Sequence, residues 1–452
     1  MTHWIDTAVF YHIYPLGLCG APQQNDHQAP PQPRLLELIP WLDHMVTLGC
    51  NALYLGPVFE SSAHGYDTAD YYWVDRRLGD HDTLRQLVAE AHRRNIRVVL
   101  DGVFNHVGRH FWAFRDVQQH RQNSAYCSWF AGLRFDQSNP YGDGFNYDTW
   151  AGFYDLVKLN LHHPDVRRHL LDAVGQWIEL YEIDGLRLDA ADVLDRDFQR
   201  ELAGFCRARR ADFWLMGEVV HGDYRQWANP GALDSVTNYE AYKGLFSSLN
   251  DRNYFEIAYA LQRQFGAGGL YTGLPLYNFV DNHDVDRVVS RLKQPAQLYP
   301  LYALLFTMPG VPSIYYGSEF GLTGKKNGSD APLRPALDLM QLRGNAPQPD
   351  LPAAIQRLAQ VRQALPALRV GRYEQIYVGP AQLVFRRQTE HQTVIVALNA
   401  DAAPVQLEVR LTGLTDGWLK DALNPPDQIR IQHGRAVLEL PANWARVMVW
   451  EA

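Results

Sequence analysis

The sequence predicts a (β/α)₈ barrel with a small inserted domain and a C-terminal antiparallel β domain. Three observations lead to this prediction. Short apolar runs alternate with helical patterns along most of the 452 residues, which is typical of βαβ units. The alternation stops once, after His106, in a long stretch without clean periodicity. Beyond Leu368 it changes to short runs of β-forming residues.

Eight candidate strands follow one another as short runs rich in β-branched and aromatic residues. Stretches with apolar residues at helical spacing separate them, and eight such units predict a closed parallel barrel. The clearest predicted helices are 35–48, 83–95, 166–181 and 352–365. The predicted strands are 8–18, 52–59, 97–104, 185–189, 213–219, 235–239, 276–281 and 311–316.

The break and the change of pattern divide the chain into three predicted parts. Residues 107–156 are rich in Trp, Phe, Tyr, Asn and Gly, and are too many for an ordinary loop, so they predict an inserted domain. Residues 1–106 and 157–367 then form the barrel, and residues 368–452 form a small sheet domain. The predicted strands of that sheet are 383–387, 393–398, 405–411 and 447–450.

Composition and charge narrow the classes of function. The formal net charge is −8 and no basic tract is present, which disfavours nucleic acid or an anionic membrane as a partner. No apolar run is long enough to span a bilayer, and the first residues do not resemble a signal peptide. The four cysteines are scattered without a CxxC pair, so we expect free thiols and a cytoplasmic protein. The aromatic content of 12% suits a sugar site, although aromatic-rich cores produce the same value.

Polar residues cluster where four of the predicted strands end. The clusters are Asp-Gly-Val-Phe-Asn-His at 101–106, Gly-Leu-Arg-Leu-Asp at 185–189, Met-Gly-Glu at 216–218 and Asp-Asn-His-Asp at 281–284. The C-terminal ends of barrel strands meet at one face, which carries the reactive groups of barrel enzymes. One acidic strand end is commonly a helix cap or a loop salt bridge. Four such ends at the same face predict an active site.

These clusters resemble the four signature regions of glycoside hydrolase family 13, the α-amylase family: DGVFNH, GLRLDAAD, GEVV and FVDNHD. The segments HGYDTADY at 64–71 and VKLN at 157–160 are similar to its neopullulanase and cyclomaltodextrinase branch. The resemblance implies that residues 107–156 are the family's domain B. It also implies a retaining α-glycoside hydrolase that cleaves α-1,4-glucosidic bonds in maltooligosaccharides, cyclodextrins or related α-glucans.

The resemblance assigns roles to the acidic residues. A retaining hydrolase needs two carboxyl groups about 5–5.5 Å apart, one as nucleophile and one as general acid and base. Asp189 corresponds to the nucleophile, Glu218 to the acid and base, and Asp284 to the third carboxylate, which binds sugar hydroxyls. Arg187 lies on the same strand face as Asp189 and is expected to lower its pKa, whereas Glu218 needs a raised pKa. Asp101 is expected to orient Arg187.

Further residues are expected around the same sugar by resemblance. His106 and His283 correspond to hydrogen-bond donors, and Tyr66 to a ring that stacks beneath the sugar. Arg287 is expected to bind Asp284 or the next sugar along the chain. A single core histidine is more often structural, but the flanking motifs favour a functional role for both histidines.

The chain departs from the family at two positions that bind calcium in many α-amylases and at one position that binds the leaving-group sugar. Many α-amylases bind a structural calcium ion through an aspartate where this chain has Lys158 and a histidine where it has Val193. Neither replacement can ligate calcium, which takes six to eight oxygen ligands. We therefore predict no metal at Asn105 and no cofactor, with the Lys158 ammonium bonded to carbonyl groups or to Asn105 instead. Asp192 replaces a lysine that binds the leaving-group sugar in many amylases.

Two other aspects of the resemblance bear on substrate. Cyclomaltodextrinase-type enzymes carry an N-terminal β domain, which we expect to be missing because the first predicted strand begins so near Met1. An α-glucan transglycosylase or isomerase would form the same covalent intermediate, so the carboxylates do not exclude it. A non-catalytic carbohydrate- or partner-binding protein on this fold usually lacks one of the three carboxylates, and this chain keeps all three.

Overall fold

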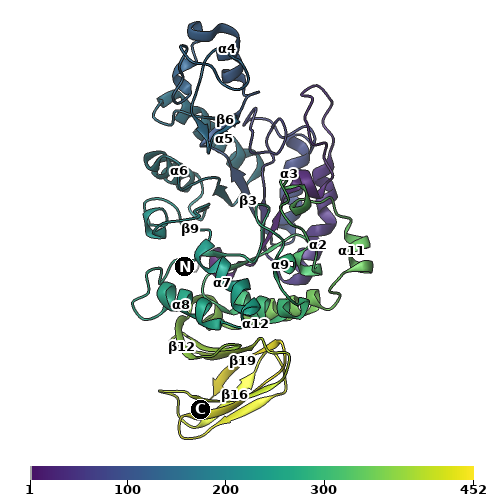
Figure 1. Ribbon diagram of the computed structural model, residues 1–452, viewed down its shortest axis with the longest axis vertical. Coiled ribbons are helices and arrows are strands. Elements are labelled where there is room, and N and C mark those ends of the chain that lie inside the picture. Colours follow the sequence, from purple (N-terminus) through teal and green to yellow (C-terminus); the bar gives the residue numbers. More distant parts are fainter. Residues whose placement is uncertain (1–2, 452) are drawn as a thin grey trace.

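The computed structural model describes residues 3–451 and has three parts along its long axis. A barrel forms the middle, a small lobe that contains α4 lies at one end, and the C-terminal strands lie at the other (Figure 1). Within residues 3–451 no helix has both the length and the apolar character needed to cross a membrane.

Eight parallel strands form the barrel, which confirms the predicted fold class. Their hydrogen-bonded order is β10-β11-β1-β2-β3-β7-β8-β9, and a parallel bridge between Thr237 and Tyr277 joins the two ends of this series. Each strand is short and fully or almost fully buried, because helices cover the outside and side chains fill the inside. The strands are β1 (Phe10–Ile13), β2 (Ala52–Leu55), β3 (Arg97–Gly102), β7 (Gly185–Leu188), β8 (Trp214–Gly217), β9 (Ser235–Val236), β10 (Tyr277–Asn278) and β11 (Val311–Tyr315).

The helices begin at residues suited to helix starts. Asp80 and Asp195 cap α3 and α6 by accepting bonds from the backbone N–H groups of Thr83 and Phe198. The predicted helix 35–48 is split into a 3₁₀ turn and α2, which has a proline in its first turn. The helices are α1 (Pro15–Leu18), α2 (Ile39–Leu48), α3 (His81–Arg93), α4 (Trp112–His120), α5 (Pro164–Tyr181), α6 (Arg196–Arg209), α7 (Tyr239–Asn250), α8 (Tyr254–Phe265), α9 (Val288–Arg291), α10 (Leu298–Thr307), α11 (Leu339–Asn345), α12 (Leu351–Ala364) and α13 (Pro366–Val370).

The insertion after β3 is built on a three-stranded antiparallel sheet in the order β4-β6-β5. Its strands are β4 (His106–Gly108), β5 (Thr149–Trp150) and β6 (Phe153–Lys158). His106 pairs with Lys158, so the sheet begins and ends at residues just outside the predicted segment 107–156. Backbone pairing therefore ties the insertion to the end of β3, while the exact domain boundaries stay a prediction.

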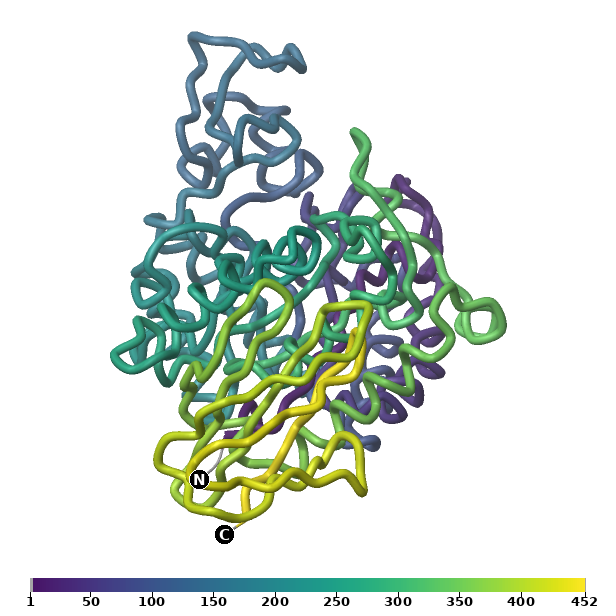
Figure 2. The backbone as a smooth tube through the Cα atoms, turned by 60° about the horizontal axis from the view of Figure 1, so that its bottom comes forward, coloured from purple at the N-terminus to yellow at the C-terminus, as the bar shows by residue number. Residues whose placement is uncertain are grey.

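The C-terminal part consists of a six-stranded antiparallel sheet and a two-stranded ribbon. Apolar side chains such as Val384, Ile395, Leu419 and Leu438 form a core between them. β12 packs against α8, and β14 and β19 pack against α10, so the sheet lies across the base of the barrel (Figure 2). The strands are β12 (Arg372–Val378), β13 (Gln382–Gln388), β14 (Thr393–Asn399), β15 (Val405–Arg410), β16 (Gly417–Asp421), β17 (Gln428–Ile431), β18 (Arg435–Leu440) and β19 (Trp444–Glu451).

Candidate active site

The polar strand ends meet at one cavity of about 1000 Å³, next to the inserted sheet. This size is at the upper end of the range for small-molecule sites. Three carboxylates line the cavity at the ends of different strands, as do aromatic rings from the first and second strand loops and from β5–β6. Residues that line it include Tyr14, Tyr66, His106, Trp150, Phe153, Asp155, Asp189, Asp192, Glu218, Tyr239, Asp284, Lys326, Asp330 and Arg334.

Arg187 lies at the centre of the acidic residues. Its guanidinium donates to Asp189 over 2.9 Å and contacts Glu218 over 2.8 Å. It also donates to both carboxylate oxygens of Asp101, over 2.9 and 3.1 Å, while Tyr54 and Tyr66 donate to the same carboxylate. Arg187 is 3% exposed, so one buried guanidinium joins the two carboxyl groups at the ends of β7 and β8.

Burial raises the pKa of both bridged carboxyl groups. The pKa of Asp189 is well above its ordinary value because burial and the charge of Glu218 together outweigh Arg187. Burial is the main cause of the raised pKa of Glu218. The negative charge of Asp284 raises this pKa further, whereas the positive charge of Arg187 lowers it. Arg187 does lower the pKa of Asp189, as expected from the sequence, but the net shift is upward because burial outweighs this effect. The charge of a neighbouring carboxylate contributes to the raised pKa of each carboxyl group, so the protonation of one is expected to affect the other.

A local backbone distortion positions Glu218. Ala190, which follows Asp189, has a φ of 45°, a conformation that non-glycine residues rarely adopt. Its N–H group donates to Glu218 Oε2 over 3.2 Å. Residues held in such conformations cost free energy and cluster at functional sites.

The third carboxylate, Asp284, lines the same cavity and is held ionised. The ring Nε2 of His283 lies 3.0 Å from it, and Arg334 donates to it over 2.9 Å. Burial raises the pKa of Asp284, but His283 and Arg334 outweigh burial and keep the pKa well below its ordinary value. Tyr66 bonds to His283 Nε2 and its ring stacks on the His283 ring, at a centroid distance of 5.4 Å and an angle of 7°.

His106 is neutral and has a free nitrogen. Burial, with His64 adding to it, lowers the pKa of His106 to about 3. Its Nε2 is buried without a hydrogen-bond partner and lies 3.8 Å from Asp189 Oδ2. The Trp150 ring lies 5.8 Å away between centroids, and Trp150 stacks on Phe153 at 5.8 Å and 21°.

Arg287 does not reach the cavity, which corrects the sequence prediction. Its side chain is fully buried and donates to the carbonyl groups of Tyr316 and Leu333 and to the hydroxyl of Ser318. Arg334, in the loop after β11, occupies the place beside Asp284 that was predicted for Arg287.

The region around Asn105 also differs in detail from its prediction. Asn105 is buried, and its side-chain amide lies 3.3 Å from His106 Nδ1. The Lys158 ammonium makes no hydrogen bond or ion pair with any residue in the range 3–451. The link between insertion and barrel is made by the backbone instead, because Leu159 N donates to Asn105 O over 3.0 Å. In the described part of the chain no group of three or more metal-ligating side chains is found.

Sequence reasoning missed several cavity residues. The only sequence signal for Arg334 as a site residue is that it follows the eighth barrel strand, because the loops after all eight strands lie at the face of the barrel that carries the active site. The Arg334 guanidinium lies over the Tyr14 ring at 4.7 Å and also contacts Asp330. Trp150 and Phe153 lie in the aromatic-rich stretch 107–156, where the sequence alone does not show which aromatic rings reach the cavity.

Comparison with known proteins agrees with this geometry. The family model "Alpha amylase, catalytic domain" matches residues 35–345, which is more than half of the chain. The chain belongs to the α-amylase family. It is 34% identical over 440 residues to a cyclomaltodextrinase from Bacillus sp., covering 92% of this chain and 76% of the relative.

Two solved structures are similar to this one over nearly the whole chain. One is a cyclomaltodextrinase, with a TM-score of 0.85 and 29% identity, covering 99% of this chain and 78% of that chain. The other is the cyclic α-maltosyl-(1→6)-maltose hydrolase from Arthrobacter globiformis, with a TM-score of 0.83 and 28% identity, covering 99% of this chain and 100% of that chain.

Proposed function

We propose that this α-amylase-family protein is a retaining glycoside hydrolase that cleaves α-1,4-glucosidic bonds in maltooligosaccharides, cyclodextrins or related α-glucans. The observation that carries the proposal is the single buried guanidinium of Arg187, which bridges Asp189 and Glu218 at the ends of neighbouring strands. Retaining hydrolysis needs two carboxyl groups this close together, because one must attack the carbon whose leaving oxygen the other protonates.

The first step forms a glycosyl ester on Asp189. Asp189 Oδ attacks the anomeric carbon while Glu218 gives its proton to the glycosidic oxygen, which leaves with the rest of the glucan. Burial supports this role because it raises the pKa of Glu218 and so favours the protonated form that a general acid needs. In the second step Glu218 removes a proton from water, whose oxygen attacks the same carbon and releases Asp189.

The remaining polar groups are suited to hold the reacting sugar. Asp284 stays ionised and can accept hydrogen bonds from two sugar hydroxyls, and such bonds strengthen when the ring distorts. His106 has an unpartnered Nε2 close to Asp189, so it can donate to a hydroxyl beside the attacked carbon. Tyr66 bonds to both Asp101 and His283, which fixes its ring at the cavity wall.

The stacked pair Trp150 and Phe153 supports a glucan as the substrate class. Phe153 is 55% exposed although its ring is apolar, and both rings line the cavity. Sugar faces are apolar and flat, so exposed aromatic rings beside a catalytic centre can bind them. The similarity to a cyclomaltodextrinase and to a cyclic α-maltosyl-(1→6)-maltose hydrolase points to the same substrate class.

The proposal extends to organisation and location. We propose residues 1–106 and 157–367 as the catalytic barrel, residues 107–156 as domain B and residues 368–452 as the C-terminal domain. All four cysteines are free thiols, three of them buried, which supports the proposed location in the cytoplasm.

A small panel of glucans tests the function. The protein is incubated with starch, a cyclodextrin, pullulan and maltotriose, and the products are separated by chromatography, with proton NMR of the first anomer released. We expect shorter α-glucans released first as the α-anomer. Release of the β-anomer would contradict retention, and absence of turnover on all four would contradict the proposed substrate class. Parallel reactions with excess maltose show how much of the glycosyl ester is transferred to sugar instead of water.

A further inference from the structure

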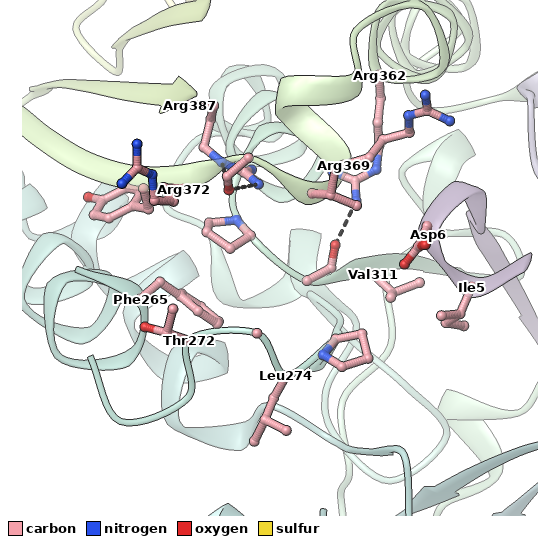
Figure 3. Close-up of a pocket in the computed structure, with 17 residues that line it drawn as sticks. Ile5, Asp6, Phe265, Thr272, Leu274, Val311, Arg362, Arg369, Arg372 and Arg387 are labelled. Carbon is pink, nitrogen blue, oxygen red and sulfur yellow. Dashed lines mark hydrogen bonds between the residues drawn. The ribbon is translucent and has the colours of Figure 1, made fainter. Parts of the chain in front are cut away.

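A second cavity, of about 250 Å³, is lined by residues of the barrel and of the segments that lead into the C-terminal sheet; Figure 3 shows its lining. Its floor comes from residues that precede barrel strands: Asp6 before β1, Leu274 before β10 and Gly310 before β11. Its roof comes from α12, α13, β12 and β13. The cavity therefore lies between the N-terminal ends of the strands and the C-terminal sheet.

The side chains around this cavity are strongly basic. Arg362, Arg369, Arg372 and Arg387 line it against a single carboxylate, that of Asp6. None of the four arginines forms an ion pair with a residue in the range 3–451, whereas most other arginines of the chain do. Buried charges in proteins are usually paired, so this cluster lacks its counter-charge.

Two of the guanidinium groups are buried. Arg362 is 2% exposed and Arg387 is 1% exposed, and both reach toward the cavity from above in the view of Figure 3. Arg362 donates to the carbonyl groups of Phe306, Leu368 and Gly310, and Arg387 donates to those of Thr307 and Gly371. These bonds hold the guanidinium groups in place, but neutral carbonyl groups do not cancel their charge.

Donor groups remain for a ligand. Each guanidinium has five N–H groups, and Arg362 and Arg387 each make only three hydrogen bonds to the protein. The Nε of Arg369 is buried without any partner. The pKa values of Arg362 and Arg387 also reflect the uncompensated charge. Burial is the main cause that lowers the pKa of each to about 9, and the positive charge of a neighbouring arginine lowers it further: Arg369 for Arg362, and Arg362 for Arg387.

We propose that this cavity binds a small oxyanion of the phosphate type, either free or as the phosphoryl group of a sugar. Guanidinium groups form paired, parallel hydrogen bonds with such oxygens, which a halide cannot reproduce. The volume of 250 Å³ is many times the roughly 30 Å³ of one water in the liquid, so a phosphate and part of a sugar can fit. The bound anion would contact both the barrel base and the C-terminal sheet, and so stabilise their contact.

Calorimetric titration of the 452-residue protein tests the site, with inorganic phosphate as the probe and sodium chloride used to keep the ionic strength constant. We expect saturable one-to-one binding, and a melting temperature that rises with phosphate concentration because the anion binds the folded state. A hexose phosphate is titrated in parallel, and tighter binding than inorganic phosphate would identify a phosphorylated sugar as the source of the anion.

Paired variants separate a specific site from general charge. Arg369→Gln with Arg372→Gln changes the two less buried arginines at the cavity and should weaken binding at least about tenfold while the protein still folds. Arg410→Gln with Arg430→Gln removes the same charge from exposed positions on β15 and β17 and should leave binding unchanged. Equal losses in both pairs, or no saturable binding of either phosphate by the unaltered protein, would overturn the proposal.

Discussion

Replacing Arg334 by methionine tests whether the residue beside Asp284 acts in the reaction. Methionine keeps much of the side-chain length but removes the charge, the bond of 2.9 Å to Asp284 and the bond of 3.0 Å to the carbonyl of His283. A hydrogen bond to a charged group contributes about 1.5–3 kcal/mol. The Asp284 side chain is 33% exposed, so solvent screening favours the lower end of that range.

At about 1.4 kcal/mol per factor of ten, this loss predicts a fall in kcat/KM of about 10- to 30-fold. The fall is measured on a maltooligosaccharide at neutral pH, with the melting temperature checked in parallel. Arg334→Lys keeps the charge and should recover part of the loss. Arg291→Met is the matched control, because it breaks an ion pair with Asp286 outside the cavity and should leave kcat/KM within about twofold. An Arg334→Met enzyme with unchanged kcat/KM, or a control that loses as much, would refute the reasoning.

Four further predictions concern the same site and the region around Asn105. Asp189→Asn should remove nearly all turnover with little change in melting temperature, and a variant that keeps more than about a tenth of the wild-type rate would contradict its role. Activity should fall as pH rises through the raised pKa of the carboxyl pair, because the general acid loses its proton. In Glu218→Gln this fall at high pH should disappear, and the variant should keep more activity on substrates with good leaving groups than on glucans. Trp150→Ala with Phe153→Ala should raise KM for maltooligosaccharides about tenfold or more, as one to three kcal/mol of stacking and burial is lost, with a smaller effect on a short aryl glucoside. EDTA should leave activity and melting temperature unchanged, and a fall of several degrees would contradict the prediction of no metal at Asn105.

The barrel could be predicted because its signal is repetitive. Each buried parallel strand is a short apolar run, and each is followed by a helical pattern, so all eight strands appear near their predicted places. The C-terminal sheet was harder to resolve into strands. In β18, Arg435–Leu440, exposed and buried residues alternate, and the charged residues Arg435 and Glu439 lie on the exposed face, so only a three-residue apolar run remains to mark the strand.

The sequence predicts correctly those site residues whose positions are determined by the ends of the barrel strands. Asp189 and Glu218 follow strands that pair directly, so their proximity follows from the topology alone. The loops determine the rest. Arg287 is near Asp284 in sequence, but its backbone direction sends the side chain into the barrel wall, whereas Arg334 approaches from a loop that begins after another strand. The net pKa shift of Asp189 was missed for a similar reason, because sequence shows the neighbouring arginine but not the depth of burial.

Trapping the covalent intermediate tests the central claim most directly. A 2-deoxy-2-fluoro or 5-fluoro α-glucosyl fluoride forms the glycosyl ester but slows its hydrolysis, because fluorine destabilises the positive charge that develops in the transition state. Intact mass spectrometry should show the addition of one glycosyl unit, and peptide mapping should place it on Asp189. The Asp189→Asn variant should remain unlabelled under the same conditions. A label on any other residue of the wild-type enzyme would contradict the assignment of Asp189 as the nucleophile, and so would turnover of the probe with inversion and no covalent label.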